Sequence, residues 1–180
     1  RTEPSANPVR IFSFSASRRL AREGWSVEDN ERGYGAGAER EWGSGENYQS
    51  HFVFAGDPDP DSGMLVNLAT VKLHVSGVIE GRYDHRFLNR DTPPFDRVPP
   101  TPENVARQLL DEAAAACREL PPLLVACHLA ESRQTGATAY ADGAVEREYW
   151  LDFSAARRTF SPHLSDEENR EVFGIASSPA

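Results

Sequence analysis

The chain has 180 residues, of which 39% are hydrophobic and 26% are charged, and its formal net charge is −9. This composition is typical of a globular protein with one good core and excludes a disordered chain. No apolar run approaches the roughly 18 residues that a membrane-spanning helix needs, so we expect no membrane partner. Nucleic acid is also an unexpected partner, because the chain is acidic and has no basic stripe to neutralise phosphates.

The cysteine content favours a reducing compartment. Cys117 and Cys127 are the only cysteines, and both lie in segments that we predict to be regular structure. We expect them to be free thiols that behave as small core hydrophobes. The expected localisation is therefore cytoplasmic.

The pattern of apolar residues predicts a series of strands separated by loops. Residues 21–45 are rich in Gly, Glu and Arg and are expected to form a long connection between the first two strands. The predicted strands are 9–16, 47–56, 64–66 and 123–130, with a short extension at 138–140 and a further strand at 147–155.

Two helices are predicted from their start signals. Asn67 is a candidate N-cap of a helix that runs to about Gly81. Thr101-Pro102-Glu103 combines a capping Thr, a Pro in the first turn and an acidic residue near the helix N-terminus. The element order therefore predicts the α+β class, with an antiparallel four-stranded sheet and two helices on one face.

One stretch of the chain occurs twice at a constant offset of 139 residues, without a gap. Residues 14–35 are repeated at 153–174, and such self-similarity indicates duplicated architecture. The positions that are identical in both copies are Phe14, Ser15, Ala16, Arg18, Arg19, Ser26, Glu28, Asn30 and Gly35.

Several short motifs together resemble the 6-pyruvoyl-tetrahydropterin synthase and 6-carboxy-tetrahydropterin synthase family, which has the T-fold. They run in the family's order along the chain. The motifs are Phe14-Ser15-Ala16-Ser17, Gly45 with Asn47-Tyr48, Ser62 to Leu68, Asp84 to Asn89, Pro100 to Ala106, and Glu131-Ser132. The resemblance implies a T-fold unit at 9–141 and the start of a second, incomplete unit at 147–180. It also implies barrel formation, by homo-oligomerisation or by tandem duplication.

The resemblance implies a zinc site of three histidines, but this chain has other residues there. Arg18 stands at the first position, and Ser44-Gly45-Glu46 replaces the family's His-Gly-His. The family's cysteine falls near Gly37. We therefore expect neither a metal nor another cofactor, because catalytic zinc needs three protein ligands. The remaining histidines show no metal-type spacing; they are His51, His74, His128 and His163.

Other family residues are retained, and the resemblance gives them roles. Asp84-His85 matches a pair that relays protons beside the substrate, although an Asp that merely caps a loop next to a His is the alternative. Glu131 matches the carboxylate that anchors the pterin ring, with Ser132 beside it. The alternative is a surface Glu at a strand end. Thr101 is also a candidate for the pocket, as is Glu103, but both fit helix-capping roles better.

Arg18 is the third kind of candidate. In the former metal position it is expected either to hold an anionic oxygen through forked hydrogen bonds or, with Arg19, to cover a sheet edge in solvent. Arg157 repeats the feature in the second copy.

Two functions remain open from the sequence. The first is a metal-independent, repurposed enzyme of the lyase, cyclase or isomerase type. It acts on a small heterocyclic or cyclic substrate through Asp84, His85, Glu46 and Arg18, with Glu131, Ser132 and Thr101 binding the substrate. The second is a catalytically inactive T-fold subunit that binds a ligand or completes a barrel. A conventional zinc enzyme ranks last.

Overall fold

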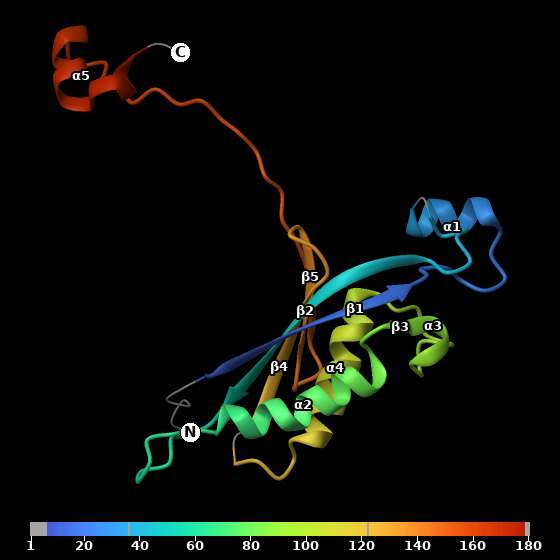
Figure 1. Cartoon of the computed structure of the whole chain (residues 1–180). Helices are drawn as coiled ribbons and strands as arrows, with labels where there is room; N and C mark the ends of the chain where they lie inside the picture. Colours follow the sequence, from blue (N-terminus) through green and yellow to red (C-terminus); the bar gives the residue numbers. More distant parts are fainter. Residues whose placement is uncertain (1–6, 36, 122, 179–180) are drawn as a thin grey trace. The chain divides into compact units, whose positions relative to one another are not determined.

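A computed structural model describes residues 7–35, 37–121 and 123–178 of the chain (Figure 1). Its centre is a sheet in the order β3-β1-β2-β4-β5-β6, in which neighbouring strands are antiparallel except for β1 and β3. The strands are β1 (Val9–Arg18), β2 (Ser44–Ala55), β3 (Arg86–Phe87), β4 (Leu123–Ala130), β5 (Thr135–Tyr140) and β6 (Val145–Tyr149).

The helices begin where the capping residues predict. Asn67 accepts a hydrogen bond from the amide of Ala69 at the start of α2, and Thr101 accepts one from Asn104 at the start of α4. The helices are α1 (Val27–Tyr34), α2 (Leu68–Arg82), α3 (Leu88–Asp91), α4 (Pro102–Ala116) and α5 (Asp166–Phe173), and a 3₁₀ helix follows at Gly174–Ser177. The α+β class is thus confirmed.

The prediction of a four-stranded sheet is wrong, because the sheet has six strands. β3 adds two residues beside Ala16 and Ser17, and β6 pairs along β5. The strand predicted at 64–66 does not form. Instead, the amide of Asp59 donates to the carbonyl oxygen of Met64 within a turn, and Leu65 and Val66 pack against the core just before the α2 cap.

Two further segments differ from the prediction. The strand expected at 147–155 ends at Tyr149, which is paired with Thr135 at the first residue of β5. Residues 150–160 belong to no described helix or strand. The long connection predicted at 21–45 contains the helix α1. The only buried residue of α1 is Asn30, so the sequence of this helix has no apolar periodicity that would predict it.

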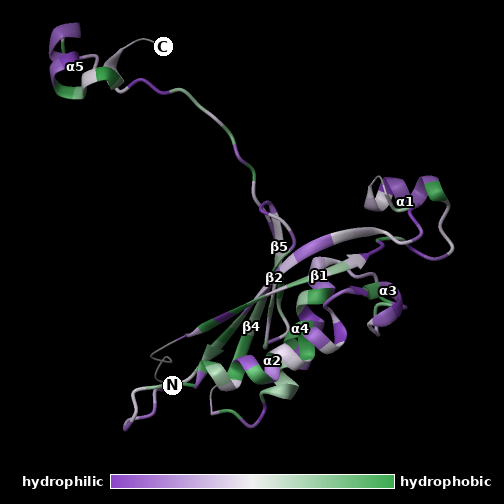
Figure 2. Cartoon of the chain, viewed as in Figure 1, coloured by the Kyte–Doolittle hydropathy of each residue, from purple (hydrophilic) through white to green (hydrophobic). Residues whose placement is uncertain are grey.

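The core lies between one face of the sheet and the two long helices. Figure 2 shows hydrophobic residues concentrated on the sheet, α2 and α4, and residues such as Val75, Leu109 and Phe52 are fully buried there. Along β1 the side chains of Phe14, Ala16 and Arg18 point to this face, because alternate residues of a strand share a face. Both cysteines are buried and free, as predicted.

The chain divides into two compact units, Arg1–Trp150 and Leu151–Ala180. Residues 179 and 180 of the expected second repeat lie outside the described residues. Within the described residues, no helix is long and apolar enough to cross a membrane.

The sequence repeat extends to individual hydrogen bonds. The side chain of Asn30 accepts from the amide of Arg22 and donates to the carbonyls of Arg22, Trp25 and Ser26. Asn169, which lies 139 residues later, makes the same four bonds to residues at the same offset, namely Ser161, Leu164 and Ser165.

An arginine repeats in the same way. Arg19 Nε donates to the carbonyl of Ala38, and Arg158 Nε donates to that of Ser177. The segments around α1 and α5 therefore share these side-chain contacts.

Candidate functional site

Asp84 and His85 form a fixed pair at the edge of β1. The amide of Ser15 donates to Asp84 Oδ1 at 3.0 Å, and His85 Nδ1 lies 2.9 Å from Asp84 Oδ2. The His85 amide donates to the carbonyl of Ser15, and its backbone has φ 57°. The hydrogen bond from Ser15, followed by the contact with His85, holds the pKa of Asp84 below its ordinary value. The imidazole is thus oriented by a carboxylate that stays ionised, while the ring is largely exposed.

This pair opens on a cavity of about 670 Å³. Ser13 and Ser15 line it from the face of β1 opposite the core, and the Ser15 hydroxyl donates to Asn47 Oδ1 at 2.7 Å. Ser132 also lines this cavity. A neighbouring cavity of about 490 Å³ is lined by both His85 and Glu46. The structure therefore brings four of the predicted site residues to two adjoining cavities.

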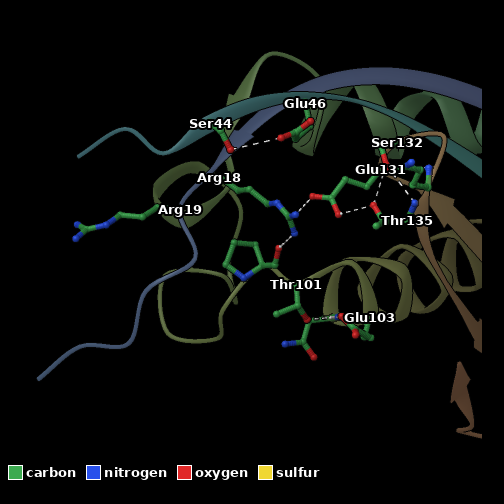
Figure 3. Close-up of polar contacts among 12 residues, drawn as sticks. Arg18, Arg19, Ser44, Glu46, Thr101, Glu103, Glu131, Ser132 and Thr135 are labelled. Carbon is green, nitrogen blue, oxygen red and sulfur yellow. Dashed lines mark hydrogen bonds and ion pairs between the residues drawn. The ribbon is translucent and has the colours of Figure 1, made fainter. Parts of the chain in front are cut away.

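Arg18 and Glu131 form a buried ion pair, shown in Figure 3. Their side chains are 6% and 10% exposed. Arg18 extends from the end of β1 across the buried face, where its Nη2 contacts Glu131 Oε1 and its Nη1 donates to the carbonyl of Pro100 at 2.6 Å. Arg18 is therefore not an exposed arginine at a sheet edge. Arg19 points away from this cluster in Figure 3.

Burial leaves two polar groups near this pair without a partner among the described residues. Arg18 Nε and the Tyr48 hydroxyl are both buried and make no hydrogen bond within the protein. Burial lowers the pKa of the Arg18 guanidinium, and it raises the pKa of Tyr48 to about 12. Both groups keep donors available on the buried face of the sheet.

The sequence did not identify Arg147 or Thr135 as members of this cluster. Arg147 on β6 lies 3.3 Å from Glu103 Oε2 and 3.8 Å from Glu131 Oε2. The Thr135 hydroxyl donates to Glu131 Oε2 at 3.4 Å. Arg147 pairs with Ala137 in the β5–β6 ladder and therefore lies on the covered face of the sheet. The alternation of side chains along β6 is the sequence signal from which this position could have been predicted.

The three positions that the family resemblance assigned to zinc ligands lie together. Arg18 is directly opposite Ser44 in the β1–β2 ladder, and Ala16 is opposite Glu46, so the three side chains share a face. Gly43 lets the two strands approach here, because its φ is +63° and a Cβ would overlap the Arg18 carbonyl oxygen. Among residues 7–35, 37–121 and 123–178, no group of three His, Cys, Asp or Glu residues is placed to hold a metal ion.

Two predicted substrate-binding residues have local structural partners. Thr101 caps α4 through its hydroxyl. The Ser132 hydroxyl accepts from the amides of Gln134 and Thr135, which fixes the turn between β4 and β5. Their expected contacts with a substrate remain predictions.

Known proteins are similar to this chain in sequence and in fold. The family model described as 6-pyruvoyl tetrahydropterin synthase matches residues 9–142. A 6-pyruvoyl tetrahydrobiopterin synthase of Poecilia reticulata is 34% identical over 134 residues, which cover 70% of this chain and 90% of the relative. The Homo sapiens protein of the same name is 38% identical over 106 residues, covering 59% and 72%.

Solved structures agree with this assignment. The 6-pyruvoyl tetrahydropterin synthase of Caenorhabditis elegans superposes with a TM-score of 0.69 at 29% identity, covering 76% of this chain and 95% of the other. An uncharacterized protein from Wolinella succinogenes superposes with a TM-score of 0.57 at 14% identity, covering 76% of this chain and 98% of the other. This likeness shows only that the fold is shared. The chain belongs to the 6-pyruvoyl tetrahydropterin synthase family.

Proposed function

We propose that this chain is a metal-independent enzyme of the tetrahydropterin synthase family, related to pterin chemistry and of the lyase, cyclase or isomerase type. Its substrate is a small heterocyclic or cyclic compound, and its setting is the cytoplasm. The observation that carries the proposal is the oriented Asp84–His85 pair, which faces a cavity large enough for such a ligand.

The donor set at the three zinc positions does not fit zinc. Arg18 is a cation engaged with Glu131, Ser44 offers a neutral hydroxyl, and only Glu46 carries a carboxylate. Catalytic zinc is held by three ligands of the N, S or carboxylate type. We therefore assign no step to a metal.

The acid–base role falls to His85. Asp84 is held by the Ser15 amide and contacts His85 Nδ1, so the other ring nitrogen is left to exchange a proton with a substrate in the cavity. Glu46 is the second candidate for proton transfer, with its carboxylate accepting from the Ser44 hydroxyl at 3.4 Å on the face that it shares with Arg18. Asp84 is the positioning residue of this arrangement.

A catalytically inactive ligand-binding or structural subunit is the alternative. The ion pair between Glu131 and Arg18 favours this alternative, because the carboxylate that is expected to bind substrate already contacts an arginine of the same chain. The capping and turn contacts of Thr101 and Ser132 favour it as well.

Ligand binding and turnover separate the two functions. Pterins and related heterocycles are screened by thermal shift, and binders are assayed for turnover with and without a chelator. We expect chelator-resistant turnover that falls by about 10²–10⁴-fold in His85→Gln, the usual size of an acid–base contribution. His74→Gln, on the exposed side of α2, is the matched control. Binding without turnover would favour the inactive subunit, and chelator-sensitive turnover would contradict metal independence.

We also propose that residues 9–141 form one T-fold unit, that residues 147–180 begin a second and that the protein self-associates. The shared contacts of Asn30 and Asn169 support the repeat. Among the described residues β6 is the last strand of the sheet, and this supports association, because an unpaired strand edge can pair with another chain. Sedimentation velocity tests association, and a monomer at all accessible concentrations would contradict it.

A further inference from the structure

The Glu131 carboxylate has both oxygens engaged within the protein. Oε1 contacts Arg18 Nη2, while Oε2 accepts from Thr135 and lies 3.8 Å from Arg147 Nη2. The side chain is 10% exposed, so solvent does not replace these partners. A buried carboxylate of this kind is stable only when it is paired, because an isolated buried charge is costly.

Arg18 binds two neighbouring acceptors with the two ends of one planar group. Nη2 contacts the Glu131 carboxylate and Nη1 donates to the Pro100 carbonyl at 2.6 Å. The site therefore presents a carboxylate and a carbonyl to adjacent N–H donors held in one plane. A guanidinium ion has this donor pattern, and so does the edge of a heterocycle that carries an amino group next to a ring N–H.

The attachment of Arg18 makes it a strong competitor. It belongs to the same chain and reaches the carboxylate from the end of β1, so an outside ligand competes with an intramolecular contact. If the side chain leaves the carboxylate for only a small fraction of the time, the apparent association constant of the ligand equals the intrinsic constant multiplied by that fraction.

We propose that Arg18 is an internal occupant of a site for planar amidine- or guanidine-type ligands, and that its side chain must leave before such a ligand reaches Glu131. This inference rests on the proposed function and deepens it, since it makes Arg18 the residue that limits access to Glu131. Glu131 and the Pro100 carbonyl are the acceptors that the ligand inherits.

The first experiment uses guanidinium chloride at about 20 mM, far below denaturing concentrations, with sodium chloride as the ionic control. Arg18→Ala opens the position that the guanidinium group held. We expect guanidinium to raise the Tm of Arg18→Ala in a concentration-dependent way, because a ligand that binds only the folded state stabilises it. The wild-type protein and Arg18→Ala/Glu131→Gln should show no such rise. An equal response of the single and double variants would overturn the proposal.

The second experiment titrates 2-amino-4-hydroxypteridine by fluorescence. We expect Arg18→Ala to bind at least about tenfold more tightly than the wild-type protein, which corresponds to the internal partner being displaced less than a tenth of the time. Arg19→Ala is the matched control, because Arg19 Nε donates to Ala38 and does not contact Glu131. Equal affinity of the wild-type protein and Arg18→Ala would also overturn the proposal.

The two experiments separate this inference from the proposed function. Rescue by guanidinium with no pteridine binding to any variant would retain the internal occupant and reject the heterocyclic ligand class. If Arg18→Ala does not fold alone, refolding from urea with guanidinium or sodium chloride gives the same comparison. The proposal then requires a higher recovery of near-UV circular dichroism with guanidinium, and equal recovery would refute it.

Discussion

The contacts of Asn169 predict how the second unit responds to a single substitution. Asn169 is fully buried, and within residues 151–178 the only other buried residue is Ser177. The Asn169 amide accepts from Ser161 and donates to three carbonyls, so it is the centre of this small unit. Asn169→Ala removes all four contacts and leaves the backbone groups around it without a partner.

The expected cost follows from the hydrogen bonds. Each intramolecular hydrogen bond contributes about 0.5–1.5 kcal/mol net, and stranded buried partners add to the loss. Because the amide has two N–H groups shared among three carbonyls, we count about three effective bonds and expect a loss of about 2–4 kcal/mol. A unit of this size has little core to offset such a loss. We therefore expect α5 to unfold locally while the sheet stays intact.

Native-state hydrogen exchange measures this loss residue by residue. Since about 1.4 kcal/mol corresponds to a factor of ten, the amides of α5 should exchange at least about thirtyfold faster in Asn169→Ala. Asn30→Ala should do the same to α1 and leave α5 unchanged, which makes it the matched control. A change of less than threefold in α5 would refute the reasoning from the shared contacts.

Three further predictions concern the first unit. Arg18→Ala should lower the free energy of unfolding by about 3–5 kcal/mol. The double variant Arg18→Met/Glu131→Leu should lower it much less, because both charges are removed. Urea denaturation measures both free energies, and equal losses in the two variants would contradict this prediction. Gly43→Ala should destabilise the protein by about 1–3 kcal/mol or more, through its positive φ and the clash with the Arg18 carbonyl; Gly45→Ala, whose Cβ meets nothing, is the control. Burial lowers the pKa of His51, so the unfolded chain takes up the proton first as the pH falls. Wild-type Tm should therefore drop more than that of His51→Gln below about pH 6.5, and parallel curves would contradict this.

The sequence predicted the features that depend on neighbouring residues. Asn67 and Thr101 predicted the first residues of α2 and α4 to within one position, because a helix cap is a contact between residues two or three apart in the sequence. The first and second strands and β4 were also found from local alternation. The helix α1 was missed although Ser26 caps it, because its buried face consists of one asparagine and gives no hydrophobic period.

The candidate site depended on contacts that local patterns do not contain. The sequence placed Arg18 two residues after the first predicted strand and Glu131 directly after another, but their ion pair exists because β1, β2 and β4 are neighbours in the sheet. Arg147 joins the cluster only through the register of β6 with β5. Asp84–His85 was found because the two residues are adjacent, whereas the Ser15 amide that fixes Asp84 lies 69 positions away.

The structure also bears on the idea that arginine replaced the metal as a positive centre. A group in that role must direct donors at the reacting atom, but Arg18 engages Nη1 with Pro100 and Nη2 with Glu131, and Nε is its one nitrogen without a partner among the described residues. His85 instead lies exposed at the cavity. We therefore expect Arg18→Ala to lower KM while kcat changes little, and His85→Gln to lower kcat by about 10²–10⁴-fold. Steady-state kinetics on a turned-over heterocycle decides between the roles: a kcat loss in Arg18→Ala as large as that in His85→Gln would establish the arginine as the catalytic cation.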